Sequence, residues 1–509
     1  MLLAIDVGTT NMKAGIMNEQ GDCLAAASRP NRQFHHPDGY MYFDPAVLWK
    51  TVAELIREVV EQAGRPPVPA VGITSMAESG LVIGRKSGEP QTMILPWFER
   101  CALEQAGKLE QSVDVLQQFV RTGLRPSYKY GLAKLLWLQK YDPASLQNGV
   151  WVSVSAYIAH CLTGNIGEEY TLAARTYAFR IDSRAWDTEL LEHLDLPTEL
   201  FPPVLEAGTA SGTVVPSLAE ELGLQTDTLV CVSGHDHVCA SLAVGAIAAG
   251  DVYNSMGTAE TMVGVLPERP LDRNDYSSGL SFGLHPRKGH LFWMGGHSAS
   301  GGSVEWLRQL FGVEAPLSYE QVLEELTRAD RKPSGIIFLP HLIGSGAPEP
   351  NPYAKGAFIG LSSKHGRGDL IKAVLEGNAY QMEAIRRSGE DANRSPIERL
   401  LVVGGGTRNR HWLQIKADVS GLELQLPAMM EATLVGAALT AGVAAGIYPD
   451  FPGAAAAVRN RDTGIIRPSP ETHVQYKRFF EQGYWPLRQP LLAYDEWLHN
   501  ERMLNAYLR

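Results

Sequence analysis

The order of apolar and polar positions predicts a chain of alternating strands and helices. Two apolar runs near the N-terminus, residues 2–5 and 12–17, flank a polar turn that contains glycine, and small and apolar residues follow at 23–27. Runs of this length between turn residues are typical of a strand meander. A helix is expected next, at about residues 45–64. The chain therefore opens with a predicted α/β unit.

The middle of the chain continues the alternation. A buried strand is predicted at 70–74, and leucines spaced along residues 130–141 form one apolar face of a helix. Another apolar strand at 228–232 runs into Ser-Gly-His-Asp-His, and a helix of small residues is expected at 238–249. Strands that alternate with helices in this way favour an α/β fold.

The pattern then begins again. An apolar strand at 252–255 enters a turn with Gly257-Thr258, and a second strand is predicted at 260–265. Because the N-terminus shows the same strand, Gly-Thr turn and strand, we expect an internal duplication with a boundary near 245–251. The sequence thus predicts an N-terminal domain, a C-terminal domain and a helical tail, which we place at residues 1–246, 247–450 and 451–509.

The second half should follow the same α/β logic. We expect a glycine-rich loop at 295–302, and we expect strand-to-helix units at 400–420 and 423–445. In the first of these units, Gly404-Gly405-Gly406 stands between the strand and the helix. A glycine run lets the backbone approach a flat ligand closely, and Asn409 could bond an adenine edge. A tight connection with Asn409 as the helix cap is the alternative.

Composition narrows the class of protein. The 509 residues are 45 % hydrophobic and 20 % charged, an ordinary globular mixture. The formal charge of −11 argues against a nucleic-acid partner, and the chain has no apolar run of the ~18 residues that a membrane span needs. The start lacks a basic segment typical of signal peptides, and five scattered cysteines suit a reducing compartment. We expect a cytoplasmic protein. A homodimer is compatible with the sequence.

The first turn could bind phosphate. Asp6 lies at the end of a predicted strand, and Gly8, Thr9 and Thr10 follow it. Backbone N–H groups and a hydroxyl in such a turn can converge on a phosphate, an adjacent carboxylate can hold Mg²⁺, and Lys13 can return as a cation. An ordinary hairpin is the alternative. Since the turn leads to a strand and no Walker motif occurs, a Walker-type ATPase is not expected.

Asp236 is the candidate base. It follows an apolar strand and precedes a helix, where open α/β sheets bind ligands, and a positioned carboxylate there can accept a hydroxyl proton. A purely structural helix cap is one alternative. A transition-metal hydrolase that uses His235 and His237 is another, although no third and fourth ligand with a convincing spacing is present.

Sugar-binding candidates follow two other apolar segments. Glu78 could accept bonds from sugar hydroxyls, with an exposed loop glutamate as the alternative. Trp97 and Glu99 could supply a stacking face and an acceptor, against a core aromatic beside a surface charge.

The order of these motifs resembles the FGGY carbohydrate kinases of the actin-like, ribonuclease H-like ATPase superfamily. The resemblance runs from Met1 to about Gly446 and includes residues 134–138, 356–361, 375–377 and 404–409. It implies an α/β fold with two ribonuclease H-like domains, a central cleft that binds ATP, and closure on sugar binding. The implied roles are the Mg²⁺-linked aspartate (Asp6), a first phosphate element (Gly8, Thr9, Thr10, Lys13), a second phosphate element (Gly257, Thr258), an adenine site (Gly405, Gly406, Asn409) and the catalytic base (Asp236).

The sugar-binding segments depart from the xylulokinases of that family. Where those enzymes have Gln-Met-His-Gly, this chain has Met76-Ala77-Glu78-Ser79. His235-Asp236 is more similar to the fuculose and rhamnulose kinases. The sequence therefore predicts an ATP-dependent kinase of a ketose such as a xylulose- or fuculose-like sugar, with Glu78, Trp97, Glu99, His235 and Asp236 near the substrate. The alternatives are a polyol or sugar-acid kinase, and a nucleotide-switched regulator without catalysis.

Overall fold

The computed structural model describes residues 1–329, 332–429, 431–458 and 463–507. Its first large sheet has the strand order β13-β14-β6-β1-β2-β3. The hairpin strands β1 and β2 and then β3 run antiparallel, whereas β1, β6 and β14 are parallel. The bounds are β1 Leu2–Val7, β2 Asn11–Met17, β3 Cys23–Pro30, β6 Ala70–Ser75, β13 Gly212–Thr213 and β14 Leu229–His235.

The second large sheet repeats this plan in the order β17-β18-β16-β15-β21-β22-β23. Strands β15, β16 and β18 run antiparallel, and β21 and β22 lie parallel to β15 on its other side. The bounds are β15 Asp251–Met256, β16 Glu260–Pro267, β17 Ser281–Leu284, β18 His290–His297, β21 Arg399–Val403, β22 Leu424–Pro427 and β23 Thr463–Ile466. The internal duplication expected from the sequence is therefore present in the topology of the sheets.

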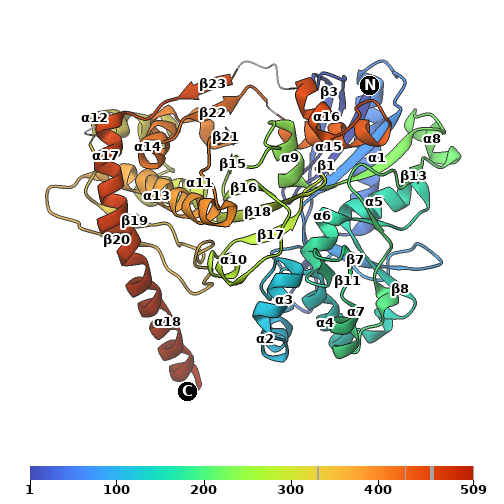
Figure 1. The fold of residues 1–509 in the computed structure, drawn as a ribbon, viewed down its shortest axis with the longest axis horizontal. Coiled ribbons are helices and arrows are strands. Elements are labelled where there is room, and N and C mark those ends of the chain that lie inside the picture. Colours follow the sequence, from blue (N-terminus) through green and yellow to red (C-terminus); the bar gives the residue numbers. More distant parts are fainter. Residues whose placement is uncertain (330–331, 430, 459–462, 508–509) are drawn as a thin grey trace.

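Helices cover both sheets (Figure 1). In the first half they are α1 Pro45–Gln62, α2 Leu103–Ser112, α3 Val115–Thr122, α4 Gly131–Tyr141, α5 Val154–Thr163, α6 Tyr170–Ala173, α7 Thr188–His193, α8 Pro216–Leu222 and α9 Asp236–Ala243. In the rest of the chain they are α10 Arg273–Ser277, α11 Ser300–Phe311, α12 Tyr319–Arg328, α13 Arg367–Asn393, α14 Arg410–Ser420, α15 Ala432–Ala444, α16 Phe451–Val458, α17 Pro470–Phe479 and α18 Trp485–Tyr507. Shorter strands pair outside the two sheets, among them β7 Gly80–Gly84 with β8 Gly149–Ser153 and β19 Ile337–Leu339 with β20 Ala357–Ile359.

Local chemistry explains where several helices begin and end. Helix α1 starts after Asp44, whose carboxylate accepts hydrogen bonds from the N–H groups of Ala46 and Val47. Helix α9 is shorter than the predicted 238–249, since Gly245 has a φ of 79° and the chain leaves the helical conformation there. The predicted glycine-rich loop at 295–302 is wrong, because its glycines lie at the end of β18 and in the first turn of α11.

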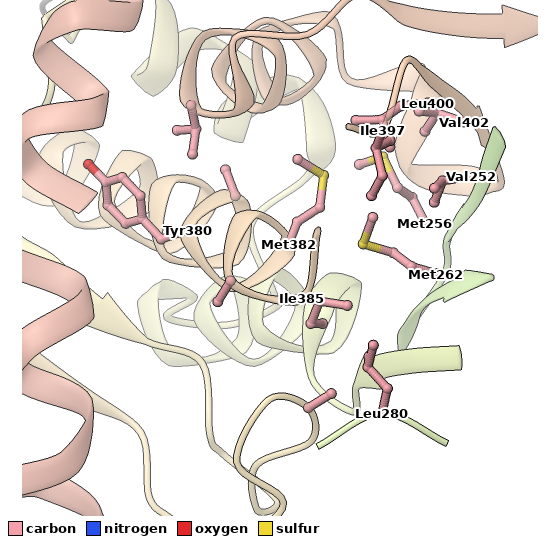
Figure 2. Close-up of a cluster of buried hydrophobic side chains, with 14 of the residues drawn as sticks. Val252, Met256, Met262, Leu280, Tyr380, Met382, Ile385, Ile397, Leu400 and Val402 are labelled. Atoms are coloured by element: carbon pink, nitrogen blue, oxygen red, sulfur yellow. The ribbon is translucent and has the colours of Figure 1, made fainter. Parts of the chain in front are cut away.

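The long helix α13 contributes to a buried hydrophobic cluster of the second half (Figure 2). Its Met382 and Ile385 lie with Met256 of β15 and Met262 of β16 in one buried hydrophobic cluster. On another side, Tyr380 contacts the rings of Tyr476, Phe480 and Tyr484. The C-terminal helices are therefore fastened to α13 by aromatic packing.

Helix α15 returns the chain to the first half. It lies beside the first sheet in Figure 1, and the backbone oxygen of Ala437 accepts a 3.1 Å hydrogen bond from Ser233 Oγ. A Cβ at Gly72 of β6 would lie 2.1 Å from that oxygen, so only glycine permits this approach. The two halves are thus joined by α15 as well as by the chain between α9 and β15, and the division at residues 246 and 247 stays a prediction.

The C-terminal segment combines a strand with helices. Strand β23 pairs with β22 at the edge of the second sheet, so the segment from 451 is not purely helical. Helix α18 then extends away from the body (Figure 1). Residues 459–462, 508 and 509 of the predicted tail lie outside the described residues. In the described part of the chain, no helix combines the length and the apolar character that crossing a membrane requires. All five cysteines are free thiols.

Candidate active site

The carboxyl ends of β1, β6 and β14 meet at one edge of the first sheet. Asp6 of β1 is in register with Thr74 of β6, and Thr74 with Gly234 of β14. The register of β14 shifts between Val232 and Gly234, and Gly234 has a φ of 97°. Because a side chain at Gly234 would also collide with Thr171 Oγ1, glycine is needed for the turn that presents the next two residues.

Asp236 is the first residue of α9. Its Oδ1 accepts a 2.7 Å hydrogen bond from the N–H of His237 and lies 3.1 Å from Nε2 of His235. Residue 235, and not Asp236, occupies the N-cap position, so the helix-cap alternative is wrong. Burial alone would raise the pKa of Asp236, but the charge of His237 and the interaction with His235 lower it to about 2. The hydrogen bond from the N–H of His237 and the contact with His235 favour the ionised form of this carboxylate, while burial lowers the pKa of His237 itself.

The pKa of Asp6 is shifted in the opposite direction from that of Asp236. Burial, followed by the negative charge of Asp236, raises the pKa of Asp6 to about 8 against the opposing effect of Lys13. Its Oδ1 is buried without a hydrogen-bond partner among the described residues. A buried, unpartnered carboxylate oxygen beside a second carboxylate suits a hard cation such as Mg²⁺. Lys13 forms a 2.7 Å ion pair with Glu431, at the residue before α15.

The first Gly-Thr turn is held in place from two sides. Asn31 donates from its backbone N–H to the oxygen of Thr10 at 2.8 Å and from Nδ2 to the oxygen of Gly8 at 2.9 Å. From the other side, Trp97 Nε1 donates to Thr9 Oγ1 at 2.9 Å. Thr10 is exposed. The turn is thus rigid, with its outer surface open.

A cavity of about 880 Å³ lies in the second half. It brings together all the residues that the sequence assigned to the second phosphate element and the adenine site: Gly257, Thr258, Gly405, Gly406 and Asn409. Large side chains that motif analysis did not select complete its walls, among them Trp306, Gln309, Tyr319 and Arg408. No residue of the first turn is part of the cavity lining as described.

The glycine triplet packs against the strand that leads to the second turn. A Cβ at Gly404 would lie 2.6 Å from the backbone oxygen of Met256, and one at Gly406 would lie 2.9 Å from Met256 Cβ. A Cβ at Gly405 would meet no atom within 4 Å and therefore faces open space. Asn409 caps α14 by accepting a 3.1 Å hydrogen bond from the N–H of Trp412. The side-chain oxygen of Asn409 therefore serves as the helix cap, as the alternative interpretation expected, and the residue also lines the cavity.

Glu78 is not an exposed loop residue. Its side chain is 12 % exposed, and its Oε1 pairs with the guanidinium of Arg175, whose Nε lies at 2.7 Å. Its φ of 60° is unusual for a residue with a side chain, and Lys134 Nζ donates to its backbone oxygen and to that of Leu95. Although burial opposes it, the charges of Arg175 and His235 lower the pKa of Glu78. Arg175 also reaches Ser281 Oγ of the second half at 3.1 Å.

The other two sugar-binding candidates, Trp97 and Glu99, differ in burial and in their contacts. Trp97 is partly buried, with Lys129 Nζ 5.4 Å from its ring centre. Glu99 is buried, and its carboxylate accepts hydrogen bonds from the N–H groups of Met41, Arg100 and Cys101. The carboxylate of Glu99 is thus engaged by backbone N–H groups, and its contact with the sugar stays a prediction.

The histidines beside Asp236 do not form a transition-metal centre. Within the described ranges, no three His, Cys, Asp or Glu side chains gather in a way that could hold a metal ion. The metal-hydrolase alternative therefore lacks its ligand set. A magnesium ion that takes one or two carboxylates and otherwise binds nucleotide phosphates needs no such cluster.

Family models cover most of the chain. The model for the N-terminal domain of the FGGY family of carbohydrate kinases matches residues 1–243, and that for the C-terminal domain matches residues 252–445. A xylulose kinase from Staphylococcus epidermidis is 26 % identical over 94 % of this chain and 95 % of its own length. A glycerol kinase from Gloeobacter violaceus is 30 % identical over 88 % of this chain and 89 % of its own length.

Solved structures share the fold. The xylulose kinase from Rhodospirillum rubrum has a TM-score of 0.88 at 26 % identity and covers 97 % of this chain and 99 % of its own. The gluconate kinase from Lactobacillus acidophilus has a TM-score of 0.89 at 22 % identity, with 97 % and 98 % covered. The predicted α/β fold with two sheet-containing, actin-like halves is thereby confirmed.

Proposed function

Because this chain belongs to the FGGY family of carbohydrate kinases and is an ATP-dependent sugar kinase, we propose that its acceptor is a ketose and that Asp236 is its catalytic base. The observation that supports this proposal best is the position of Asp236 directly after β14, two strands from Asp6, where its carboxylate accepts the N–H of His237 and lies 3.1 Å from His235 Nε2. An ionised, positioned carboxylate argues against a regulator of the same superfamily that lacks catalysis.

The reaction needs one proton acceptor and accurate positioning. The sugar oxygen attacks the γ-phosphorus of ATP, the bond from that phosphorus to the bridging oxygen breaks, and ADP leaves. A carboxylate with a pKa of about 2 is a weak base, so Asp236 would accept the hydroxyl proton late, as the phosphoryl group arrives. The helix position of Asp236 and its contact with His235 fix the carboxylate for this transfer.

The residues near Asp6 suit a magnesium ion that arrives with ATP. Asp6 would hold it directly or through water, with its buried Oδ1 as the available oxygen. When bound, the ion would offset negative charge on the phosphates. The cavity with Gly257, Thr258, Gly405, Gly406 and Asn409 is our proposed nucleotide site. Since the first turn lies outside this cavity, closure of the halves would bring Thr9 and Thr10 toward the phosphates.

The charges around the proposed sugar site favour a neutral substrate. The positive charge of Arg175 is already paired with Glu78, and Asp236 adds a carboxylate nearby. The carboxylate of a sugar acid would therefore find the Arg175 guanidinium already neutralised and would be repelled by Asp236. A ketose or a polyol avoids this repulsion, and the 30 % identical glycerol kinase makes a polyol the second candidate.

A coupled assay of ADP release tests the proposal. Xylulose, ribulose, fuculose and rhamnulose should be compared with glycerol, longer alditols and aldonic acids at equal concentrations. We expect the highest kcat/KM with a ketose and the lowest with an aldonic acid. A clear preference for glycerol would replace the ketose by the polyol, and a preference for an aldonic acid would contradict the charge argument.

A further inference from the structure

A buried carboxylate lies behind the proposed nucleotide cavity. Glu260 begins β16, directly after the second Gly-Thr turn, and is 1 % exposed. Its carboxylate accepts hydrogen bonds from Nδ2 of Asn254 at 2.9 Å, from Oγ of Ser300 at 2.7 Å, and from Nζ of Lys416 at 2.6 Å. Burying both a carboxylate and an ammonium costs desolvation free energy that an apolar pair would not cost. Such a pair calls for a reason beyond stability.

Three of the partners of Glu260 belong to three walls of the cavity, and a fourth, His297 at the end of β18, has its Nε2 3.4 Å from the Glu260 carboxylate. Asn254 lies in β15, which leads into Met256 and Gly257. Ser300 begins α11, and Lys416 lies in α14. Each of these elements supplies lining residues, for example Gly301 from α11 and Trp412 from α14. Glu260 itself is not part of the lining. One side chain therefore connects three walls without entering the space between them.

The start of α11 lies directly on the second turn. The N–H of Gly301 donates to the oxygen of Gly257 at 3.0 Å, and the N–H of Gly302 donates to the oxygen of Thr258 at 3.0 Å. A Cβ at Gly301 would lie 2.6 Å from the Gly257 oxygen, so the approach requires glycine. The hydroxyl of Ser300 ties this point of contact to Glu260.

We propose that Glu260 is a positioning residue for the nucleotide. It sets the spacing between the second turn, α11 and α14, and so determines the affinity for ATP without touching ATP. A carboxylate is suited to this task because its two oxygens accept several hydrogen bonds in fixed directions, and charge-assisted bonds are stronger than neutral ones. The proposal rests on the nucleotide site proposed above.

The first test removes one connection without leaving a buried charge unpaired. Ser300→Ala breaks the link between Glu260 and α11, and we expect KM for ATP and Kd for ADP to rise several-fold while KM for the sugar stays unchanged. Ser303→Ala is the matched control, because Ser303 is equally buried in the same helix but bonds to Ser300 and Asn378 instead. Equal nucleotide affinity in Ser300→Ala and the wild type would overturn the proposal.

The second test separates positioning from stability. Glu260→Gln together with Lys416→Met removes both charges of the Glu260–Lys416 pair and keeps His297 in place, and glutamine retains a single acceptor oxygen. We expect a melting temperature close to that of Ser303→Ala and a raised KM for ATP. If the double variant has the melting temperature of Ser303→Ala and the wild-type KM for ATP, the role of Glu260 is purely structural. If the double variant does not fold, Ser300→Ala decides alone.

The failure of the nucleotide site itself would look different. Gly405 lines the cavity. If a bulky residue at this position leaves the affinity for ADP at its wild-type value, the proposed nucleotide site is contradicted. In contrast, a sensitive Gly405 variant combined with an insensitive Ser300→Ala would contradict only the role of Glu260.

Discussion

The indole Nε1 of Trp97 donates a hydrogen bond of 2.9 Å to Oγ1 of Thr9. The backbone N–H of Trp97 also donates a 3.0 Å hydrogen bond to Oγ of Ser79, the residue after Glu78. The first Gly-Thr turn and the loop that carries Glu78 are therefore held together through one tryptophan. This contact couples the proposed phosphate side of the site to its sugar side.

Trp97→Phe should weaken that coupling while preserving the ring. Loss of one hydrogen bond costs about 1 kcal/mol, so we expect kcat to fall roughly fivefold with a small change in melting temperature. Trp137→Phe, at another partly buried tryptophan on α4, is the control and should leave kcat unchanged. Equal kcat values for the two variants would mean that the Trp97 bond has no role in turnover.

Gly405 and Gly406 should respond differently to the same substitution. A side chain at Gly405 would project into open space, so Gly405→Leu should raise KM for ATP at least about tenfold and leave the fold intact. A side chain at Gly406 would press on Met256, so Gly406→Leu should destabilise the protein by roughly 1–3 kcal/mol. Thermal unfolding and ATP titrations measure both effects. Unchanged ATP kinetics in Gly405→Leu would speak against the nucleotide site.

Magnesium binding should release a proton from Asp6. With a pKa of about 8, Asp6 holds a proton at pH 7 before the metal binds, and a metal requires the ionised form. Affinity for Mg-ADP should therefore increase up to about tenfold per pH unit from pH 6 to 8 and level off above. Calorimetry in buffers of different ionisation enthalpy measures the proton release. Asp6→Asn should abolish it, and a wild-type protein that releases no proton would exclude Asp6 as the ligand.

The same pKa predicts a pH-dependent stability of the nucleotide-free protein. Because Asp6 has a higher pKa in the folded state than its ordinary 3.8, the folded protein binds more protons, and its stability falls as the pH rises from about 4 to 8. Asp6→Asn removes this dependence. The melting temperature of the variant minus that of the wild type should therefore increase from about pH 4 to pH 8 and remain constant above pH 8. A difference that does not vary with pH would refute the raised pKa.

Glu78 and Arg175 should show the behaviour of a buried ion pair. Glu78→Gln leaves the Arg175 charge unpaired, and we expect a loss of about 3–5 kcal/mol. Glu78→Gln combined with Arg175→Met should recover most of that stability but not the affinity for the sugar, since the carboxylate acceptor remains absent. Sugar KM values and denaturant unfolding curves of both variants test this. Full recovery of sugar affinity in the double variant would remove Glu78 from the sugar site.

Local patterns predicted the parts of the site that depend on neighbouring residues. The two Gly-Thr turns, the glycine triplet and the His235-Asp236 turn follow strands in the sequence, and the structure has them after β1, β15, β21 and β14. Strand ends and glycine turns leave a clear local signal because backbone conformation requires those residue types.

Distant contacts left no such signal. Glu99 follows Trp97 closely, but its carboxylate turns to Met41, which is 58 positions away in the sequence. Arg175 pairs with Glu78 across 97 positions, and Glu260 meets Lys416 across 156. Only the packing of the folded chain brings these groups together, so the motifs did not reveal the backbone contacts of Glu99 and gave no sign of Arg175 or Glu260.

The role of Asp236 is tested most directly by Asp236→Asn. The variant keeps the shape of the side chain but cannot accept a proton, and loss of a general base typically costs ~10²–10⁴ in rate. Asp44→Asn is the matched control, because Asp44 does cap a helix and asparagine caps nearly as well as aspartate. The measurement is kcat for sugar-dependent ADP release, with sugar and ATP binding measured alongside. We predict a kcat reduced at least about a hundredfold with binding preserved in Asp236→Asn and a normal kcat in Asp44→Asn; near wild-type turnover in Asp236→Asn would contradict the assignment of Asp236 as the base.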